Sequence, residues 1–410
     1  MLETQVGAII RLNRIHQNIS VRGLAEIVGI EYSQLSKIER GMESSNPVTM
    51  ESIFEALDLN YHQTMDYLPS CINKVHKLYH DILYRKPKED LISQLEALNE
   101  ESHKMGLTTP LLLINLVFNL LWQQPCEYDI LITILSKVDD TMSLMQRQVF
   151  KQYQGFYQFL KGDFDDAIQK LEEAETFYMD ASNLAMISYQ KGVIYAKHGD
   201  FLEAFESLGE AKRLFEQHHN YIRSAFCSVC IANIHLMTGK YHKSRILYEE
   251  MLEVYHNFGL GPEDKLIICN NLLYLCILME EYDNFLPTFE SFDEDVRQLM
   301  EKCSQYFYYQ MMVAYHKDDM ALCKKAIDQF EALNQDPVHK YMAKYYRLKI
   351  DGAESEELIK VLDHNLKAIE KTSFPASNRV VLKLMLKEHQ HSNDYETLYK
   401  YALKLCEIKM

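Results

Sequence analysis

Apolar side chains recur every three or four residues over most of the chain, a spacing that is typical of amphipathic helices. The first such pattern runs from about residue 4 to 17 and includes Val6, Ile9 and Ile10. After about residue 67 the predicted helices become longer, about fifteen residues each, and they occur in pairs. We therefore expect an all-α protein that joins a short segment of one design to a long remainder of another.

Two short helices with a sharp turn between them follow the first helix. Ser20 can cap a helix that runs through Leu24 and stops where Gly29 can adopt a left-handed turn. Ser33 can cap a third helix, which ends at Gly41. This plan predicts a helix-turn-helix, whose second short helix would enter the major groove of DNA. The expected outer face of that helix consists of Tyr32, Ser33, Gln34 and Lys37.

This opening segment resembles the lambda-repressor-like (XRE/Cro) DNA-binding family over about residues 3 to 68. The resemblance implies a five-helix domain at residues 1–68 that binds double-stranded operator DNA. The family often has a glutamine where this chain has Val21, and Arg22 beside it is the expected substitute. The matching positions are Leu24-Ala25, Gly29-Ile30, Ser33, Leu35 to Gly41, Pro47 and Leu57-Asp58-Leu59. The DNA-contacting residues that the resemblance implies are Ser20, Arg22, Tyr32, Ser33, Gln34, Lys37 and Arg40.

A repeated pattern occupies much of the remainder. Polar turns that end in a large apolar residue occur at KGDF (161–164), HGDF (198–201), TGKY (238–241), MEEY (279–282), KDDM (317–320) and SNDY (392–395). Three positions after each turn lie Ala167, Ala204, Ser244, Phe285, Cys323 and Leu398. Twelve positions before the first five of these lie Gly155, Gly192, Ala232, Leu273 and Met311. Small residues at such positions allow two helices to cross closely.

The repeat resembles the tetratricopeptide family in a loose, long-period form, and residues 71–104, 108–139 and 340–372 are predicted as further helix pairs. The resemblance implies a right-handed superhelix over residues 69–410, with a concave groove that binds a peptide or a protein segment. An asparagine in that groove could hold a peptide backbone, because its amide both donates and accepts. A single surface asparagine is usually only solvated. The expected peptide-binding residues are Gln152, Tyr189, Asn233, Asn270, Asn271, Tyr274, Gln305 and Tyr308.

The charge of the chain limits how it can bind nucleic acid. The formal net charge of -16 would repel a polyanion on average, so any DNA binding must be local. Residues 1–66 hold five basic and nine acidic residues, a formal net of -4, which predicts weak nonspecific affinity for DNA. A degenerate domain that serves only dimerisation is the alternative interpretation of this segment.

No pattern in the sequence indicates export, membrane insertion, metal binding or a cofactor. The chain begins without a signal-like apolar run, and its most apolar segment, residues 111–122, is too short to span a bilayer. The nine cysteines are therefore expected to be reduced in the cytoplasm, with Cys227 and Cys230 as core residues rather than zinc ligands. Phosphate-binding, metalloprotease and nucleophile-elbow motifs are absent from the sequence, so we expect no catalytic residue.

Together, the two halves resemble the RRNPP family (Rap, Rgg, NprR, PlcR and PrgX) of intracellular peptide-pheromone receptors of Gram-positive bacteria. The resemblance implies a homodimeric transcription regulator of quorum sensing, whose repeats bind a short signalling peptide. A Rap-like phosphatase or antagonist of a response regulator is the enzymatic alternative, with Gln94, Gln123 or Gln124 as candidates to position water. A DNA-binding scaffold that recruits a protein partner is a third possibility.

Overall fold

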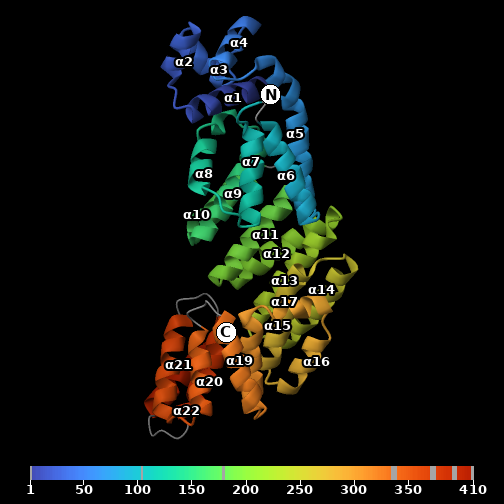
Figure 1. Ribbon diagram of the computed structural model, residues 1–410, viewed down its shortest axis with the longest axis vertical. Helices are drawn as coiled ribbons and strands as arrows, with labels where there is room; N and C mark the ends of the chain where they lie inside the picture. The colour runs from blue at the N-terminus through green and yellow to red at the C-terminus, as the bar shows by residue number, and fades with distance from the viewer. Residues whose placement is uncertain are drawn as a thin grey trace. The chain divides into compact units, whose positions relative to one another are not determined.

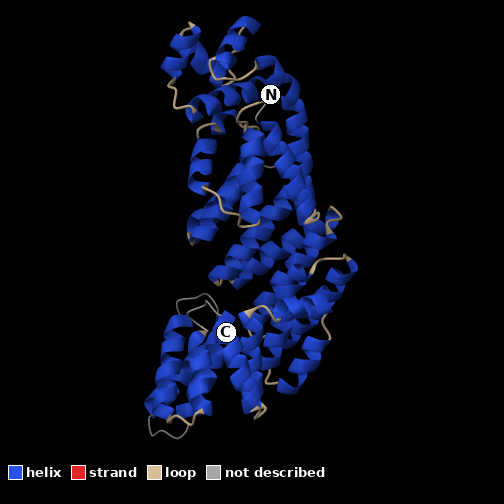
Figure 2. Cartoon of the chain, viewed as in Figure 1, coloured by secondary structure: helices blue, strands red, loops and turns tan. Residues whose placement is uncertain are grey.

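The computed structural model describes residues 2–102, 105–177, 181–333, 339–369, 375–389 and 395–407. Every regular element within these ranges is a helix, and none of them is a strand (Figure 2). The prediction of an all-α protein is therefore confirmed. The chain divides into two compact units, one formed by residues 1–194 and 209–224 and the other by residues 195–208 and 225–410. Within the described ranges, no helix combines the length and apolar character needed to cross a membrane.

Five helices open the first unit (Figure 1). They are α1 (Leu2–His16), α2 (Val21–Val28), α3 (Tyr32–Glu39), α4 (Pro47–Glu55) and α5 (Tyr61–Leu83). Their shared core includes Ile10, Leu24, Leu35, Ile53 and Phe54, all fully or nearly fully buried. The predicted domain boundary at residue 68 falls inside α5, which continues without interruption to Leu83.

Two of the caps and turns predicted between these helices are present in the structure, and one is not. The Ser20 hydroxyl accepts a hydrogen bond from the Gly23 backbone N–H, and Gly29 adopts a left-handed conformation (φ 77°), as expected. The prediction that Ser33 caps the third helix is wrong, because α3 begins at Tyr32 after an extended Glu31. The Gly29 and Ile30 N–H groups both donate to the same α2 carbonyl, which closes the turn early.

The first unit continues with further helices. They are α6 (Lys88–Ser102), α7 (Thr109–Leu121), α8 (Tyr128–Ser136), the 3-10 helix η1 (Asp139–Thr141), α9 (Leu144–Lys161) and α10 (Phe164–Glu175). Two helices, α11 (Ala181–His198) and α12 (Phe201–Gln217), contribute residues to both units, as does the following helix α13 (Tyr221–Met237). The helix pairs predicted at residues 71–104 and 108–139 correspond to α5 with α6 and α7 with α8.

The second unit consists of helix pairs around one apolar core. Its helices are α13 (Tyr221–Met237), whose first residues belong to the first unit, α14 (Tyr241–Asn257), α15 (Pro262–Leu278), η2 (Tyr282–Asn284), α16 (Phe285–Glu290), α17 (Glu294–Met300), α18 (Ser304–His316), α19 (Met320–Leu333), α20 (Lys340–Ile350), α21 (Ser355–Ile369), α22 (Pro375–His389) and α23 (Tyr395–Glu407). The pair predicted at 340–372 is α20 with α21. The helix expected after the MEEY turn begins as η2 and is divided into α16 and α17 at residues 291–293. Pro287 lies in the first turn of α16, where its missing N–H removes no helical hydrogen bond.

The repeat spacing predicted from the sequence is confirmed by contacts between paired helices. The Ser244 hydroxyl donates to the Ala232 carbonyl (2.8 Å), and the Cys323 thiol to the Met311 carbonyl (3.3 Å). A Cβ at Gly155 would lie 2.8 Å from a carbonyl oxygen of α10. Equivalent turn residues adopt positive φ in the first five repeats: Gly162, Gly199, Gly239, Glu280 and Asp318. Most of the sixth predicted turn, residues 392–394, lies outside the described residues.

Candidate DNA-binding and peptide-binding surfaces

The outer face of α3 presents polar side chains to solvent. Tyr32, Ser33 and Lys37 are exposed and Gln34 is half-buried, whereas Leu35 and Ile38 are buried in the core of the five helices. This is the orientation that the sequence predicts. The role of these side chains in contacting DNA stays a prediction.

The cations near α3 already contact neighbouring side chains. Lys37 forms an ion pair with Glu43 (Nζ to Oε2, 3.3 Å). The Arg40 guanidinium donates to the hydroxyl and to the carbonyl of Ser36 on α3, at 3.2 and 3.1 Å. The Arg22 guanidinium lies 5.4 Å from the centre of the Tyr32 ring, which brings it beside the start of α3. These cations are exposed, so a phosphate could replace their present partners at modest cost.

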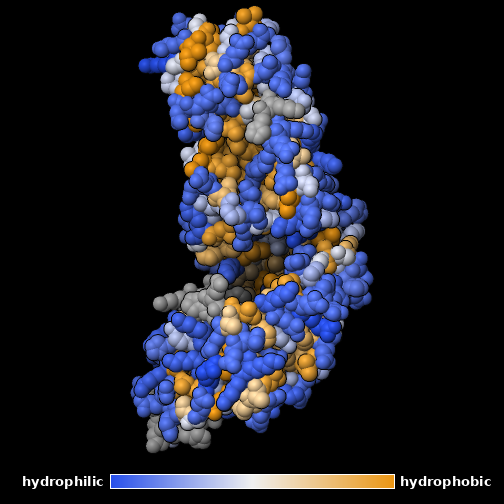
Figure 3. All heavy atoms as spheres, in the orientation of Figure 1, coloured by the Kyte–Doolittle hydropathy of each residue, from blue (hydrophilic) through white to orange (hydrophobic). Residues whose placement is uncertain are grey.

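Exposed apolar side chains, which no sequence pattern indicated, surround the same helices. Ile27 on α2 is 63% exposed, and Met42 and Val48 are each 71% exposed. Figure 3 shows apolar atoms gathered at the surface over α2 and α4. Val48 sits in the first turn of α4 and Met42 in the preceding loop, where helical periodicity carries little information. Such side chains can contact thymine methyl groups or another protein chain.

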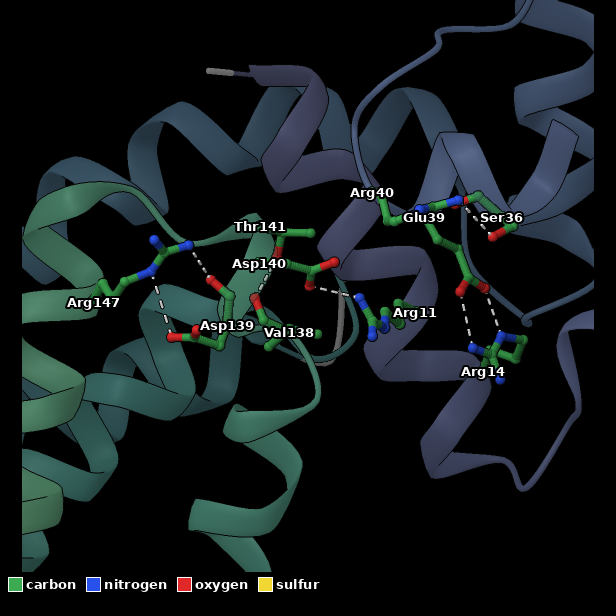
Figure 4. A network of polar contacts seen from close by, with 10 residues as sticks. All are labelled: Arg11, Arg14, Ser36, Glu39, Arg40, Val138, Asp139, Asp140, Thr141 and Arg147. Carbon is green, nitrogen blue, oxygen red and sulfur yellow. Dashed lines mark hydrogen bonds and ion pairs between the residues drawn. The ribbon is translucent and has the colours of Figure 1, made fainter. Parts of the chain in front are cut away.

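A buried ion pair fixes α3 against α1 (Figure 4). The Arg14 guanidinium donates to both carboxylate oxygens of Glu39, from Nε at 2.5 Å and from Nη2 at 2.9 Å. A third bond runs from Arg14 Nη1 to the Ile19 carbonyl (2.8 Å). The two side chains are only 9% and 4% exposed, so water screens the pair weakly. The orientation of α3 therefore depends on α1.

α1 also contacts the segment that leads into the first repeat. Arg11 forms an ion pair with Asp140 of η1 (2.7 Å), and the neighbouring Asp139 accepts from Arg147 of α9 through its carbonyl (2.8 Å). The Asn13 amide donates to and accepts from the backbone of Leu107, at 3.1 and 2.9 Å. Polar contacts thus connect α3, through α1 and η1, to α9 (Figure 4).

Within the second unit, two of the predicted asparagines join in one cluster. Asn233 Oδ1 accepts from the Tyr248 hydroxyl (2.5 Å) and from Asn271 Nδ2 (2.9 Å), and Asn271 Nδ2 also lies 2.9 Å from that hydroxyl. Burial raises the pKa of Tyr248, so the phenol stays a protonated donor. Asn233 Nδ2 and Asn271 Oδ1 have no partner among the residues that the structure describes. The pair therefore offers one donor and one acceptor.

Of the remaining candidates of the second unit, two are half-buried and two are buried. Asn270 is half-buried, and its buried Oδ1 has no hydrogen-bond partner within the described part of the chain. Tyr274 is 7% exposed and stacks on the Tyr309 ring (5.4 Å between centres). Tyr308 is 6% exposed and meets the His339 ring edge to face. Gln305 is half-buried on α18. These tyrosines form part of the core and present little surface to a ligand.

The candidates of the first unit differ from each other in burial. Gln152 is completely buried, and its Nε2 donates to Gln190 Oε1 (2.9 Å) between α9 and α11. A side chain in this position packs two helices together, which argues against its prediction as a peptide contact. Tyr189 on α11 is half-buried, and its predicted role is untested.

The fold occurs in solved structures of known proteins. A Rap protein complexed with competence and sporulation factor superposes with a TM-score of 0.62 over 83% of this chain and 98% of its own, at 13% identity. NprR in complex with its cognate peptide NprX gives 0.56, 82% and 98%, at 16% identity. Aspartyl phosphate phosphatase F from Bacillus subtilis gives 0.56, 83% and 94%, at 16% identity.

This chain has the fold of the Rap and NprR proteins. The superpositions establish the fold, and the low sequence identities leave the activity open. No family model matches the sequence, and no curated protein matches it either.

Of the glutamines predicted for a Rap-like reaction, one lies on α6 and the other two are neighbours in the loop after α7. Gln94 on α6 donates to Asp81 of α5 (3.4 Å). Gln124, beyond the end of α7, donates to the Trp122 carbonyl (3.1 Å), and Gln123 beside it adopts a positive φ of 49°. These contacts are made with neighbouring residues or the neighbouring helix. They do not bring the three glutamine side chains together in one site.

Proposed function

We propose that the protein is a peptide-responsive transcription regulator of the RRNPP type, which reads operator DNA with α3 as a homodimer in the cytoplasm. The observation that carries the proposal is the geometry of α2, the left-handed Gly29 and α3, which presents Tyr32, Ser33 and Lys37 to solvent. A short helix in this arrangement can enter a major groove. One such domain buries a small interface with DNA, so useful affinity requires two of them.

The ligand in this proposal is a short signalling peptide bound by the repeats. Asn233 Nδ2 and Asn271 Oδ1 could pair with one C=O and one N–H of its backbone. The bonds to Tyr248 fix both amides before the peptide arrives, which lowers the entropic cost of binding. The likeness to NprR, which was solved with its cognate peptide, supports this role.

The contacts between α3 and α9 provide a path for the response. A peptide that binds one arrangement of the repeats better than another would shift α9, and the bonds of Arg147, Asp140 and Arg11 would pass that shift to α1. The buried Arg14–Glu39 pair would then move α3 with α1. The spacing between the two DNA-reading helices of a dimer would change in consequence.

The test uses full-length protein and fluorescence anisotropy on two DNA duplexes, one selected by the protein from a random pool and one of scrambled sequence. Gln34→Ala should weaken binding to the selected duplex by about 1–3 kcal/mol and leave binding to the scrambled duplex unchanged. Glu55→Ala, which removes an exposed side chain at the end of α4, is the control. An equal loss on both duplexes would contradict base reading by α3.

A further inference from the structure

A cavity of about 420 Å³ lies within the second unit, at the C-terminal ends of α15 and α18. Its walls come from these helices, η2, α20 and α22, so all of its lining residues belong to one compact unit. The size falls in the range of about 300–1,000 Å³ that is usual for small-molecule sites. None of the residues proposed above to bind a peptide backbone lines it.

The charge around this cavity is opposite to that of the chain. Arg379, Lys383 and Lys387 follow each other at intervals of four residues, so they lie along one face of α22. Glu280 is the single acidic residue in the lining. Three cations therefore meet one carboxylate here, in a chain whose formal net charge is -16.

One of these cations has no ion pair of its own among the described residues, although its charge also acts on Glu280. Lys383 forms an ion pair with Glu280 (2.5 Å), and Arg379 donates to the Tyr241 hydroxyl. Lys387 is exposed and makes no hydrogen bond or ion pair with any residue that the structure describes. Its ammonium group is available to a negatively charged ligand.

A buried hydroxyl in the wall also requires a partner. Tyr346 is completely buried, and its hydroxyl has no hydrogen-bond partner within the described ranges. Buried hydroxyl groups in proteins are nearly always hydrogen-bonded. Burial raises the pKa of Tyr346 well above its usual value, so the phenol remains a donor rather than a second anion. A carboxylate oxygen is one acceptor that would satisfy this hydroxyl.

Apolar side chains complete the lining. Ile277, Leu278, Met312 and Leu384 contribute aliphatic surface. On one side the ring of His316 stacks on that of Tyr282, with 4.4 Å between centres and 6° between planes. A ligand that fills the cavity would therefore have an apolar body joined to an acidic head.

We propose that this cavity binds an organic carboxylate with an apolar body, whose carboxylate oxygens pair with the Lys387 ammonium group and the Tyr346 hydroxyl. The proposal does not depend on DNA binding. The same chemistry is found in a free aliphatic acid and in the carboxyl end of an apolar peptide, and the two sources can be separated by experiment.

Isothermal titration calorimetry on the full chain provides the test, with octanoate and octanamide for the free acid and acetyl-Leu-Leu-Leu and its C-terminal amide for the peptide end. In at least one pair the acid should bind about tenfold or more tightly than the amide, the difference expected for a charge-assisted hydrogen bond. Lys387→Met should remove that difference. Tyr346→Phe, which keeps the ring, should weaken the same acid about fivefold or more.

The matched control is Lys360→Met, which removes an exposed lysine of α21 that does not line the cavity. It should leave the affinity of the acid unchanged. Binding by octanoate alone identifies a free acid as the source, and binding by the tripeptide alone identifies a peptide end. The proposal is overturned if neither acid binds, if acids and amides bind equally, or if Lys387→Met and Lys360→Met have the same effect.

Discussion

Replacing Glu39 by glutamine isolates the contribution of the buried ion pair to the position of α3. Glu39→Gln keeps the shape of the side chain but leaves the Arg14 guanidinium charged and without its carboxylate. Removing one partner of a buried pair typically costs about 3–5 kcal/mol. Arg14 keeps its bond to the Ile19 carbonyl, so we expect about 3 kcal/mol, at the lower end of that range. The stability of α3 against α1 should fall by this amount.

Hydrogen–deuterium exchange with mass spectrometry can measure this loss in the full chain, because it reports local opening helix by helix. A change of about 3 kcal/mol should accelerate exchange of the α3 amides by roughly a hundredfold, with little effect on α13 to α15. Glu43→Gln is the matched control, since its pair with Lys37 is exposed and should contribute less than about 1 kcal/mol. Unchanged α3 exchange in Glu39→Gln would refute the reasoning.

Three further predictions concern the repeats. Gly155→Ala should lower the free energy of unfolding by about 1–3 kcal/mol in denaturant titrations, because its Cβ would lie 2.8 Å from a backbone oxygen, whereas Gly209→Ala meets no atom within 4 Å and should stabilise by about 0.4–1 kcal/mol. The hydrogen bond from Lys265 lowers the pKa of Asp293, so this pair stabilises the fold above about pH 3.9 and ceases to do so as the carboxylate is protonated at lower pH. Asp293→Asn should therefore be less stable than the parent at pH 7, by up to about 1 kcal/mol for a half-exposed partner, and equal to it near pH 2 in thermal unfolding. Asn233→Asp keeps the acceptor that holds its neighbours but removes the free donor, so calorimetry should show the peptide bound roughly 5- to 150-fold more weakly.

Local structure could be predicted from the sequence where a residue type is required by the backbone. The left-handed turn at Gly29 is an example, because glycine adopts positive φ without steric cost. The small residues spaced twelve positions apart also predicted contacts, such as that of Ser244 with the Ala232 carbonyl. The start of α3 could not be placed to the residue, since it depends on how tightly the preceding turn closes rather than on the capping preference of Ser33.

Side-chain contacts between residues far apart in the chain could not be predicted from the sequence patterns. Arg14 and Glu39 are separated by 25 positions, and only the packing of α1 on α3 brings them together. The repeat spacing assigned Asn233 and Asn270 to the groove, with Asn271 adjacent. The bonds that Asn233 and Asn271 share with Tyr248 require the geometry of three helices. Gln152 followed the same pattern and is nevertheless buried, because α11 packs over it. Spacing identifies a helix face, and the neighbouring helix decides whether that face is open.

Selection of DNA from a random pool by the full-length protein tests the central claim most directly. If two α3 helices read operator DNA in a symmetric dimer, the enriched sequences should contain an inverted repeat whose half-sites lie about 34–36 Å apart, or a multiple of that distance. Enrichment by Gln34→Ala should be lost or altered at specific positions of each half-site. A pool that stays random after repeated rounds, at an ionic strength low enough to retain nonspecific binding, would contradict the account and favour a protein partner instead.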